Sequence, residues 1–207
     1  MAKVLLLNGS PHADGCTAAA LNEMIKVFQE SGIETELIHV GSKSIRGCIA
    51  CGKCGKLGKC VFDDDLVNQA APKFEKADGL VVGSPVYYAS PNGTILSFMD
   101  RLFYSTPFSK HMKVGAAVVS CRRGGNTATF DVLNKYFTIS AMPVASSTYW
   151  NQVHGRSAED VKKDLEGLQT MRNLAKSMSF MIKAFAAAKN DYPALQKDFF
   201  TSFPDGK

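Results

Sequence analysis

The sequence predicts an α/β fold in which a five-stranded parallel sheet is covered by helices on both faces. Short apolar runs alternate with segments of helical spacing, and each strand–helix unit takes roughly 30–40 residues. The composition of the 207 residues, 45% hydrophobic and 21% charged, is that of a globular domain. We therefore expect one domain over residues 1–190, followed by a C-terminal tail over residues 191–207.

In the first part of the chain, residues 3–8 form an apolar run that ends in Gly9 and Ser10, as expected of a buried strand. From residue 16 to 31 apolar side chains recur at helical spacing, and Gly32 then marks the end of a helix. Residues 34–40 alternate like a second strand. A cysteine-rich loop at 47–61 follows, and aspartates 63–65 are expected to cap a helix of about ten residues.

The second part of the chain continues the alternation. We predict strands at 79–83, 114–120 and 142–147, and helices at 92–104, near 126–138 and from 157 to about 189. An aromatic tail with Phe199, Phe200 and Phe203 is expected to pack on the body or on a second subunit. This succession predicts a flavodoxin-like, doubly wound, three-layer α/β/α architecture with strand order 2-1-3-4-5.

Charge and hydropathy exclude several classes of function. The net charge of +5 suits an anionic ligand but is too small to predict nucleic-acid binding. No apolar stretch approaches the ~18–20 residues of a membrane span, and the chain opens directly on an apolar strand without a signal-peptide pattern. Six cysteines in such a chain imply a reducing compartment, and we expect a cytoplasmic protein.

Four cysteines, Cys48, Cys51, Cys54 and Cys60, lie in the run GCIACGKCGKLGKC. The Cys-x2-Cys-x2-Cys-x5-Cys spacing brings soft thiolate ligands around one small volume, as an iron–sulfur cluster requires. A structural zinc site fits less well, because it usually uses two Cys-x2-Cys pairs set well apart. A loop of reduced, metal-free thiols, one of which could serve in redox chemistry, is the remaining alternative.

The predicted topology places ligands beyond the carboxyl ends of the strands, where the strand order reverses. The loop after the first strand, residues 9–17, combines glycines and small hydroxyl residues with a helix start, which suits a phosphate. It contains neither a G-x-G-x-x-G fingerprint nor a Walker motif, which favours a mononucleotide. An ordinary strand–turn–helix connection is the alternative.

The loops after the third and fourth strands are also candidates. In residues 84–91, two prolines stiffen the chain beside Tyr87 and Tyr88, which could support a planar ring or simply pack half-buried. In residues 120–127, glycines permit close backbone approach, and arginines could meet negative charge or form a solvated turn. All three loops fall at one sheet edge, and this favours a common ligand.

The motifs resemble those of the NADPH-dependent FMN reductase superfamily, and within it the iron–sulfur flavoproteins. The similarity is carried by the Gly-Ser-Pro opening at 9–11 with Gly15 and Thr17, by the Ser-Pro-Val-Tyr segment at 84–87, and by the Asp100-Arg101 pair. The compact cysteine motif followed by acidic residues is also similar. A further family-like segment runs from Trp150 to Gly155.

The resemblance implies a non-covalent FMN with contacts to all three loops and, at the cysteines, a 4Fe–4S cluster. The resemblance implies that the FMN phosphate is bound by Ser10, His12, Cys16 and Thr17. The residues expected beside the isoalloxazine ring are Pro85, Val86, Tyr87 and Tyr88, and those near its other edge are Ser120, Cys121, Arg122, Gly124 and Gly125. The expected cluster ligands are Cys48, Cys51, Cys54 and Cys60. His12 stands where the family commonly has arginine, and Cys16 where a small polar residue is frequent. No catalytic acid–base pair or nucleophile is predicted.

The resemblance therefore implies an FMN-dependent oxidoreductase that moves electrons from NAD(P)H or ferredoxin to quinones, oxygen species or free flavin. It also implies a homodimer or homotetramer, because in this family a cluster in one subunit typically lies near the flavin of another. A metal-free NAD(P)H-dependent FMN or quinone reductase is the first alternative. A flavodoxin-like electron carrier is the second, although flavodoxins tend to be acidic and this chain is not.

Overall fold

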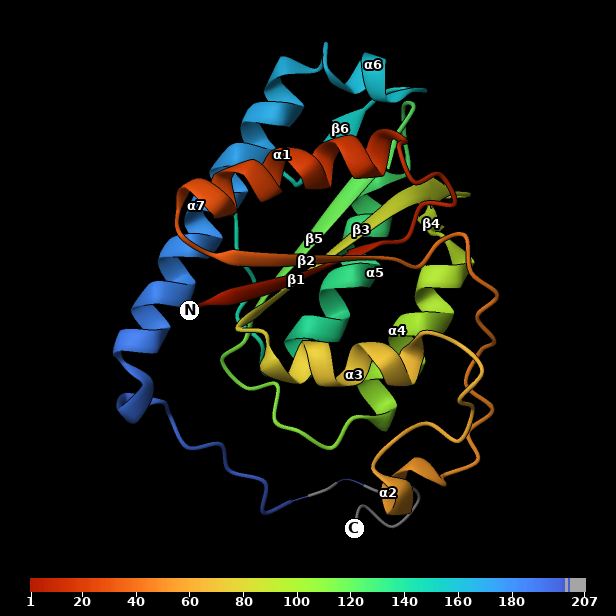
Figure 1. Cartoon of the computed structure of the whole chain (residues 1–207), viewed down its shortest axis with the longest axis vertical. Coiled ribbons are helices and arrows are strands. Elements are labelled where there is room, and N and C mark those ends of the chain that lie inside the picture. The colour runs from red at the N-terminus through yellow and green to blue at the C-terminus, as the bar shows by residue number, and fades with distance from the viewer. Residues whose placement is uncertain (200, 202–207) are drawn as a thin grey trace.

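The computed structural model describes residues 1–199 and 201, and it confirms the α/β architecture (Figure 1). Parallel strands run in the spatial order β2-β1-β3-β5-β6, and a two-residue strand, β4, pairs antiparallel with the end of β3. Counted as parallel strands only, this is the predicted order 2-1-3-4-5. The strands are β1 (Lys3–Asn8), β2 (Glu34–His39), β3 (Gly79–Tyr87), β4 (Ser90–Pro91), β5 (Val114–Cys121) and β6 (Gln152–His154).

Helices cover both faces of the sheet and make the three layers visible in Figure 1. On one side lie α1 and α7, and on the other lie α3, α4 and α5. The helices are α1 (Cys16–Glu30), α2 (Cys54–Leu57), α3 (Val67–Lys76), α4 (Gly93–Ser105), α5 (Asn126–Ile139), α6 (Ala158–Val161) and α7 (Leu165–Ala187), with a 3-10 turn, η1, at Lys189–Asp191.

Strand β1 shows why its sequence is apolar throughout. Its side chains alternate between the two faces, so that Val4 and Leu6 pack under α1 and α7, while Leu5 and Leu7 pack under α3, α4 and α5. All four are fully buried. A strand covered on both faces needs apolar residues at every position, and the run 3–8 follows that rule.

The fifth parallel strand does not lie where the sequence predicted it. Residues 142–147 contribute only an isolated bridge between Val144 and Gly115, whereas β6 at Gln152–His154 pairs with β5. Pro143 lacks the N–H that a strand donates to its neighbour, and only its carbonyl is used, by the Gly115 amide at 2.8 Å. The predicted strand at 142–147 was therefore wrong.

The predicted helix from 157 to about 189 is also interrupted. Ser157 and Asp160 form a capping box that starts the short α6, and the Asp164 side chain then accepts the Gly167 amide at 2.9 Å to start α7. Among the aspartates at 63–65, Asp65 accepts the Val67 amide at 3.0 Å, at the start of α3. Two caps in succession divide the long helical pattern into two helices.

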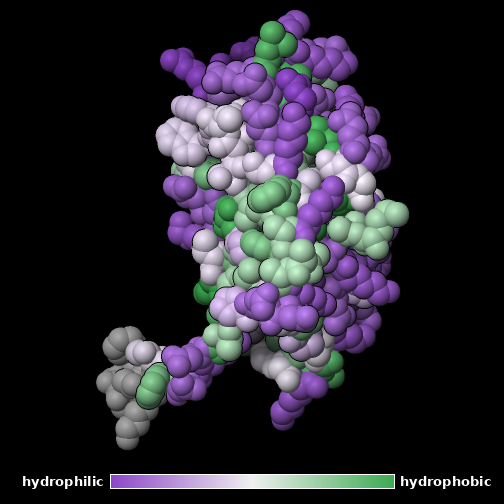
Figure 2. Space-filling view, turned by 90° about the vertical axis from the view of Figure 1, so that its left-hand side faces the viewer, coloured by the Kyte–Doolittle hydropathy of each residue, from purple (hydrophilic) through white to green (hydrophobic). Residues whose placement is uncertain are grey.

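The end of the described chain leaves the body after Tyr192, whose ring meets His111 and Phe185 edge to face. Phe199 is exposed, so it does not pack on the body, and Phe200 and Phe203 lie outside the described residues. Figure 2 shows apolar side chains gathered on the face formed by α7, where Phe180 is exposed. Among residues 1–199 and 201, no helix has the length and apolar character to cross a bilayer.

Candidate functional site

A cavity of about 240 Å³ opens at the carboxyl edge of β1, β3 and β5, where the topology predicts a ligand. It brings together most of the residues that the sequence predicted for a flavin mononucleotide, and it adds three others. The lining residues are Ser10, His12, Gly15, Cys16, Thr17, Pro85, Val86, Tyr87, Ser120, Cys121, Arg122, Gly155 and Arg156.

The loop after β1 presents free backbone amides to this cavity. Gly15 precedes α1 in an extended conformation, and no side chain caps the first turn of the helix. The amides of that turn therefore have no intrahelical acceptor, and together with the positive end of the helix dipole they suit a phosphate. Upstream, the Ser10 amide donates to Asn8 Oδ1 at 3.0 Å and the His12 amide to Ser10 Oγ at 3.2 Å, which fixes the turn.

The same loop is held in place by the end of β2 and the chain that follows it. The His39 Nε2–H donates to the Ser10 carbonyl at 2.7 Å. Gly41 lies so close that a Cβ there would overlap the carbonyl oxygens of Gly9 and Ser10. Only glycine permits this approach, so Gly41 is a steric requirement of the loop that the sequence reading did not recognise.

The floor of the cavity is polar and joins two loops. Thr17 and Ser120 share a hydrogen bond of 2.8 Å between their hydroxyl oxygens, and both residues are buried. Cys16 and Cys121 flank this pair. Burial raises the pKa of both thiols, so both are protonated at neutral pH. The site therefore holds neutral hydroxyl and thiol groups, and neither thiol is set up as a nucleophile.

The loop after β3 provides an apolar wall through Pro85, Val86 and Tyr87. The chain then turns sharply, because Tyr88 and Ala89 both have positive φ, and Tyr88 points fully into solvent rather than into the cavity. Gly125, with φ of 86°, lies where a Cβ would be 2.8 Å from Ala89 Cα. The backbone at Gly125 therefore packs directly against this turn, and a larger residue there would clash with it.

Three predicted residues, Tyr88, Gly124 and Gly125, do not line the cavity, whereas three others do. One of these, Gly15, lies within the predicted loop 9–17, and the other two are Gly155 and Arg156. Gly155 and Arg156 follow β6, and their place at this edge depends on where the fifth strand lies. The family-like segment from Trp150 to Gly155 was the available signal.

The four cysteines of the motif line a second hollow, of about 20 Å³, between their loop and the C-terminal end of α4. Cys48 and Cys51 are exposed, Cys54 is partly buried, and Cys60 is buried. The Cys60 Sγ accepts a hydrogen bond from Arg101 Nε at 3.2 Å. Within the described part of the chain, no three Cys, His, Asp or Glu side chains lie close enough to hold a single metal ion.

Two side chains of α4, those of Arg101 and Ser105, line this hollow. Arg101 is 1% exposed and forms an ion pair with the buried carboxylate of Asp65. Burial alone would disfavour the cation, but hydrogen bonds to Asp65 and Cys60 keep the Arg101 pKa above its ordinary value. The hydroxyl of Ser105, which also lines the hollow, is buried without a hydrogen-bond partner.

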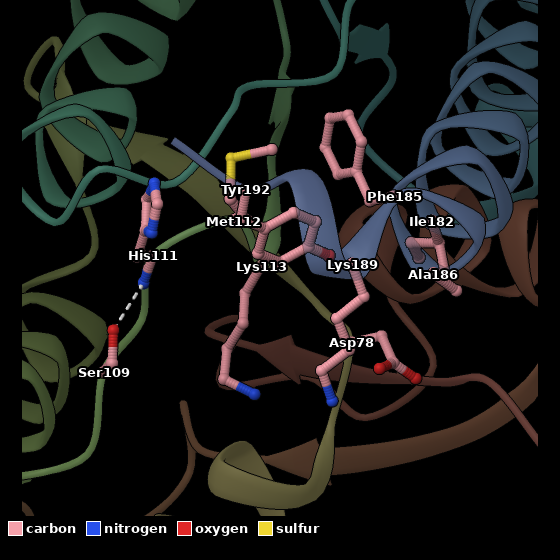
Figure 3. Close-up of a pocket in the computed structure, with 10 residues that line it drawn as sticks. All are labelled: Asp78, Ser109, His111, Met112, Lys113, Ile182, Phe185, Ala186, Lys189 and Tyr192. Atoms are coloured by element: carbon pink, nitrogen blue, oxygen red, sulfur yellow. Dashed lines mark hydrogen bonds between the residues drawn. The ribbon is translucent and has the colours of Figure 1, made fainter. Parts of the chain in front are cut away.

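A cavity of about 280 Å³ lies at the opposite, amino edge of the sheet (Figure 3). Side chains from α7 and from the segment before β5 face one another there, together with Tyr192. The Lys113 Nζ already donates to the carbonyls of Glu75 and Ala77, and the Asp78 carboxylate accepts the Lys3 amide at 2.8 Å. These charged groups are engaged in the fold, which leaves the carboxyl-edge cavity as the better candidate.

Comparison with known proteins agrees with this geometry. The model of the NADPH-dependent FMN reductase family matches residues 2–155. An iron–sulfur flavoprotein of Methanocaldococcus jannaschii is 35% identical over 192 residues, covering 87% of this chain and 97% of the relative. An iron–sulfur flavoprotein of Methanosarcina thermophila is 29% identical over 181 residues, covering 85% of this chain and 93% of its own length.

Solved structures show the same fold at low sequence identity. RosB, solved with bound 8-demethyl-8-formylriboflavin-5′-phosphate, matches with a TM-score of 0.73 at 13% identity, covering 99% of this chain and 93% of RosB. A flavodoxin from the domain Archaea matches with a TM-score of 0.58 at 14% identity, covering 87% of this chain and 99% of the flavodoxin.

Proposed function

The chain belongs to the NADPH-dependent FMN reductase family and groups with its iron–sulfur flavoproteins, and we propose that it transfers electrons from NAD(P)H or ferredoxin to small acceptors such as quinones, oxygen species or free flavin. Its membership confirms the family resemblance and identifies a flavoprotein oxidoreductase. The observation that carries the proposal is the carboxyl-edge cavity, in which three loops from β1, β3 and β5 converge on uncapped helix amides.

Different cavity residues would bind different parts of FMN. We assign the phosphate to the loop of Ser10, His12 and Thr17 and to the first-turn amides of α1. Pro85, Val86 and Tyr87 offer an apolar wall for the ring, and the segment 120–122 lies across the cavity from it. FMN, when bound, supplies hydride and single-electron chemistry, while the protein binds and orients it and limits its contact with water.

We also propose that Cys48, Cys51, Cys54 and Cys60 hold a 4Fe–4S cluster, a group that exchanges single electrons. Three features support this: the all-thiol ligand set, the guanidinium that donates to the Cys60 sulfur, and the buried Ser105 hydroxyl that lacks a partner. A four-iron cluster separates its thiolates more widely than a single metal ion does. Loosely gathered thiols around one hollow are therefore compatible with it.

The loop that carries the cysteines is strongly basic, which supports an acidic electron carrier as donor. Between residues 41 and 61 there are five Lys or Arg residues and no Asp or Glu, in the order Lys43, Arg46, Lys53, Lys56 and Lys59. A positive surface around the proposed cluster would steer a negatively charged protein such as a ferredoxin toward it. We therefore place the ferredoxin site on this loop.

We propose that the active form is a homodimer or homotetramer. Helix α4 begins beside the flavin cavity and ends at the cysteine hollow, and its 13 residues span about 20 Å at 1.5 Å per residue. Such a separation within one chain is unfavourable for electron exchange. Exposed Tyr104, Ile139, Tyr149 and Trp150 on or near α4, α5 and β6 offer apolar surface for a second copy.

The test is purification without oxygen, followed by flavin extraction and by analysis of iron and acid-labile sulfide. We expect one FMN per chain, with iron and sulfide in the amounts of a four-iron cluster. Cys51→Ser should lose iron and sulfide but keep FMN. Protein that neither contains nor takes up FMN would refute the oxidoreductase assignment. FMN without iron, together with NAD(P)H oxidation in air, would instead indicate the metal-free reductase.

A further inference from the structure

The phosphate-binding loop proposed above has too little positive charge of its own. Residues 9–17 contain no Lys or Arg, and their charged side chain is the acidic Asp14. The phosphate of FMN carries about −1.5 to −2 charges near neutral pH. Backbone amides and a helix dipole offset part of that charge, and a permanent cation is expected nearby.

Arg156 lies at the same end of the cavity. It and Arg122 are the two arginines that line the cavity. Arg122 belongs to the loop after β5, which we assign to the flavin ring, whereas Arg156 belongs to the segment that leads into α6. Helix α6, which follows it, packs on α1, and the carboxylate of Asp160 lies near enough to influence the pKa of Cys16. The segment after β6 thus adjoins the N-terminal end of α1, where the phosphate is expected.

The backbone around Arg156 is fixed, while its guanidinium is available. The Gly155 amide donates to the Cys121 carbonyl at 3.0 Å, and the Arg156 amide donates to Asp160 Oδ2 at 3.1 Å. A Cβ at Gly155 would lie 2.9 Å from Asp160 Cβ, so the turn is tight. Among the described residues, the Arg156 side chain is exposed and makes no hydrogen bond or ion pair.

We propose that Arg156 is the residue that binds the FMN phosphate by charge, and that it thereby selects the phosphorylated flavin over riboflavin. This inference rests on the proposed FMN site. A guanidinium is a permanent cation and can donate two parallel hydrogen bonds to phosphate oxygens. An imidazole such as that of His12 lacks this planar fork of donors. The cation that the loop lacks is supplied from the end of the fifth strand.

The test compares FMN with riboflavin. The full chain, freed of flavin, is titrated with each compound while the quenching of flavin fluorescence is followed. Arg156→Gln should raise the dissociation constant for FMN by about 10–100-fold, as the loss of a charge-assisted hydrogen-bonded contact does. It should change the constant for riboflavin by less than about threefold, because riboflavin has no phosphate.

Two further variants make the result specific. Lys162→Gln removes the same charge from the same segment without touching the cavity, and it should leave both constants unchanged. His12→Arg, introduced together with Arg156→Gln, should recover much of the lost FMN affinity, because it returns a permanent cation to the phosphate end.

Two outcomes would overturn the inference while the proposed function stands. One is that the chain binds FMN and Arg156→Gln leaves its affinity unchanged. The other is that Arg156→Gln weakens FMN and riboflavin equally, which would place Arg156 beside the ring. If the unmodified chain binds neither compound, the proposed function itself fails, and this inference fails with it.

Discussion

The buried pair of Arg101 and Asp65 offers a sharp test of how the cysteine loop is held. The guanidinium of Arg101, a residue of α4, donates hydrogen bonds to four groups of the loop. These are the Asp65 carboxylate, the Cys60 sulfur, and the carbonyls of Arg46 and Phe62 at 3.2 and 3.3 Å. The side chains of Arg101 and Asp65 are 1% and 4% exposed. One side chain thus ties three parts of a loop that has little regular structure.

The expected cost of removing it follows from the charge left behind. Arg101→Met preserves length and apolar bulk but leaves the Asp65 carboxylate buried without its partner. Breaking one side of a buried ion pair typically destabilises a protein by about 3–5 kcal/mol. At ~2–4 °C per kcal/mol for a chain of this size, the melting temperature should fall by about 6–20 °C. The double variant Arg101→Met/Asp65→Asn should regain at least half of the loss, because no buried charge remains unpaired and asparagine still offers an acceptor to the Val67 amide.

The assay is thermal unfolding followed by circular dichroism on protein freed of cofactors, so that ligand binding does not contribute. Lys59→Met serves as the control. It removes a cation of the same loop whose partner, Asp63, is exposed, and it should leave the melting temperature nearly unchanged. The reasoning is refuted if Arg101→Met has the same melting temperature as the unmodified protein, or if the double variant is less stable than either single variant.

Three more predictions follow from the site and its supports. Gly41→Ala should displace the phosphate-binding loop, destabilising the fold by about 1–3 kcal/mol and weakening FMN binding, and unchanged affinity in a flavin titration would contradict this. The two cavity thiols, Cys16 and Cys121, have raised pKa values, so alkylation of cofactor-free protein at neutral pH should modify the exposed Cys48 and Cys51 well before them; equal rates by mass spectrometry would argue against it. Burial would raise the pKa of Glu23, but hydrogen bonds from Arg172 and Lys26 outweigh it and lower that pKa. Glu23→Gln should therefore cost up to about 1 kcal/mol at neutral pH, and urea melts of the two proteins should converge as the pH falls through the lowered carboxylate pKa, rather than stay parallel.

The parts of the fold that the sequence predicted are those with a strong local signal. Strands β1, β3 and β5 are covered by helices over most of their length, and burial on both faces leaves continuous apolar runs that are easily recognised. The location of the site followed from these strands alone, because the position of a ligand in a doubly wound sheet depends on strand order rather than on side-chain detail. This is why the loops around Ser10, Pro85 and Ser120 were found together.

The parts that the sequence did not reveal depend on partners distant along the chain. Strand β6 has three residues, and its pairing depends on hydrogen bonds of flanking groups, from the Val119 amide to the Asn151 carbonyl and from the Gly155 amide to the Cys121 carbonyl. The sequence analysis named Arg101 only as part of the Asp100-Arg101 pair, and its burial is explained only by the loop folded over it. Neither feature has a local pattern, and Arg156 was overlooked with β6.

Helix α4 connects the two candidate sites and also keeps them apart. At its start, the Asn92 side chain caps the helix by accepting the Thr94 amide at 2.7 Å, and the Asn92 amide donates to Ser84 Oγ at 2.9 Å, beside the flavin wall. At its end, Arg101 is fixed to the cysteine loop. Both ends are anchored, so movement within one chain cannot bring the hollow to the flavin cavity without breaking a buried ion pair or a helix cap. The proposed homodimer or homotetramer would offer a more direct route for electron exchange between the two proposed cofactors, across a surface that includes the exposed aromatic residues at the end of α4 and before β6.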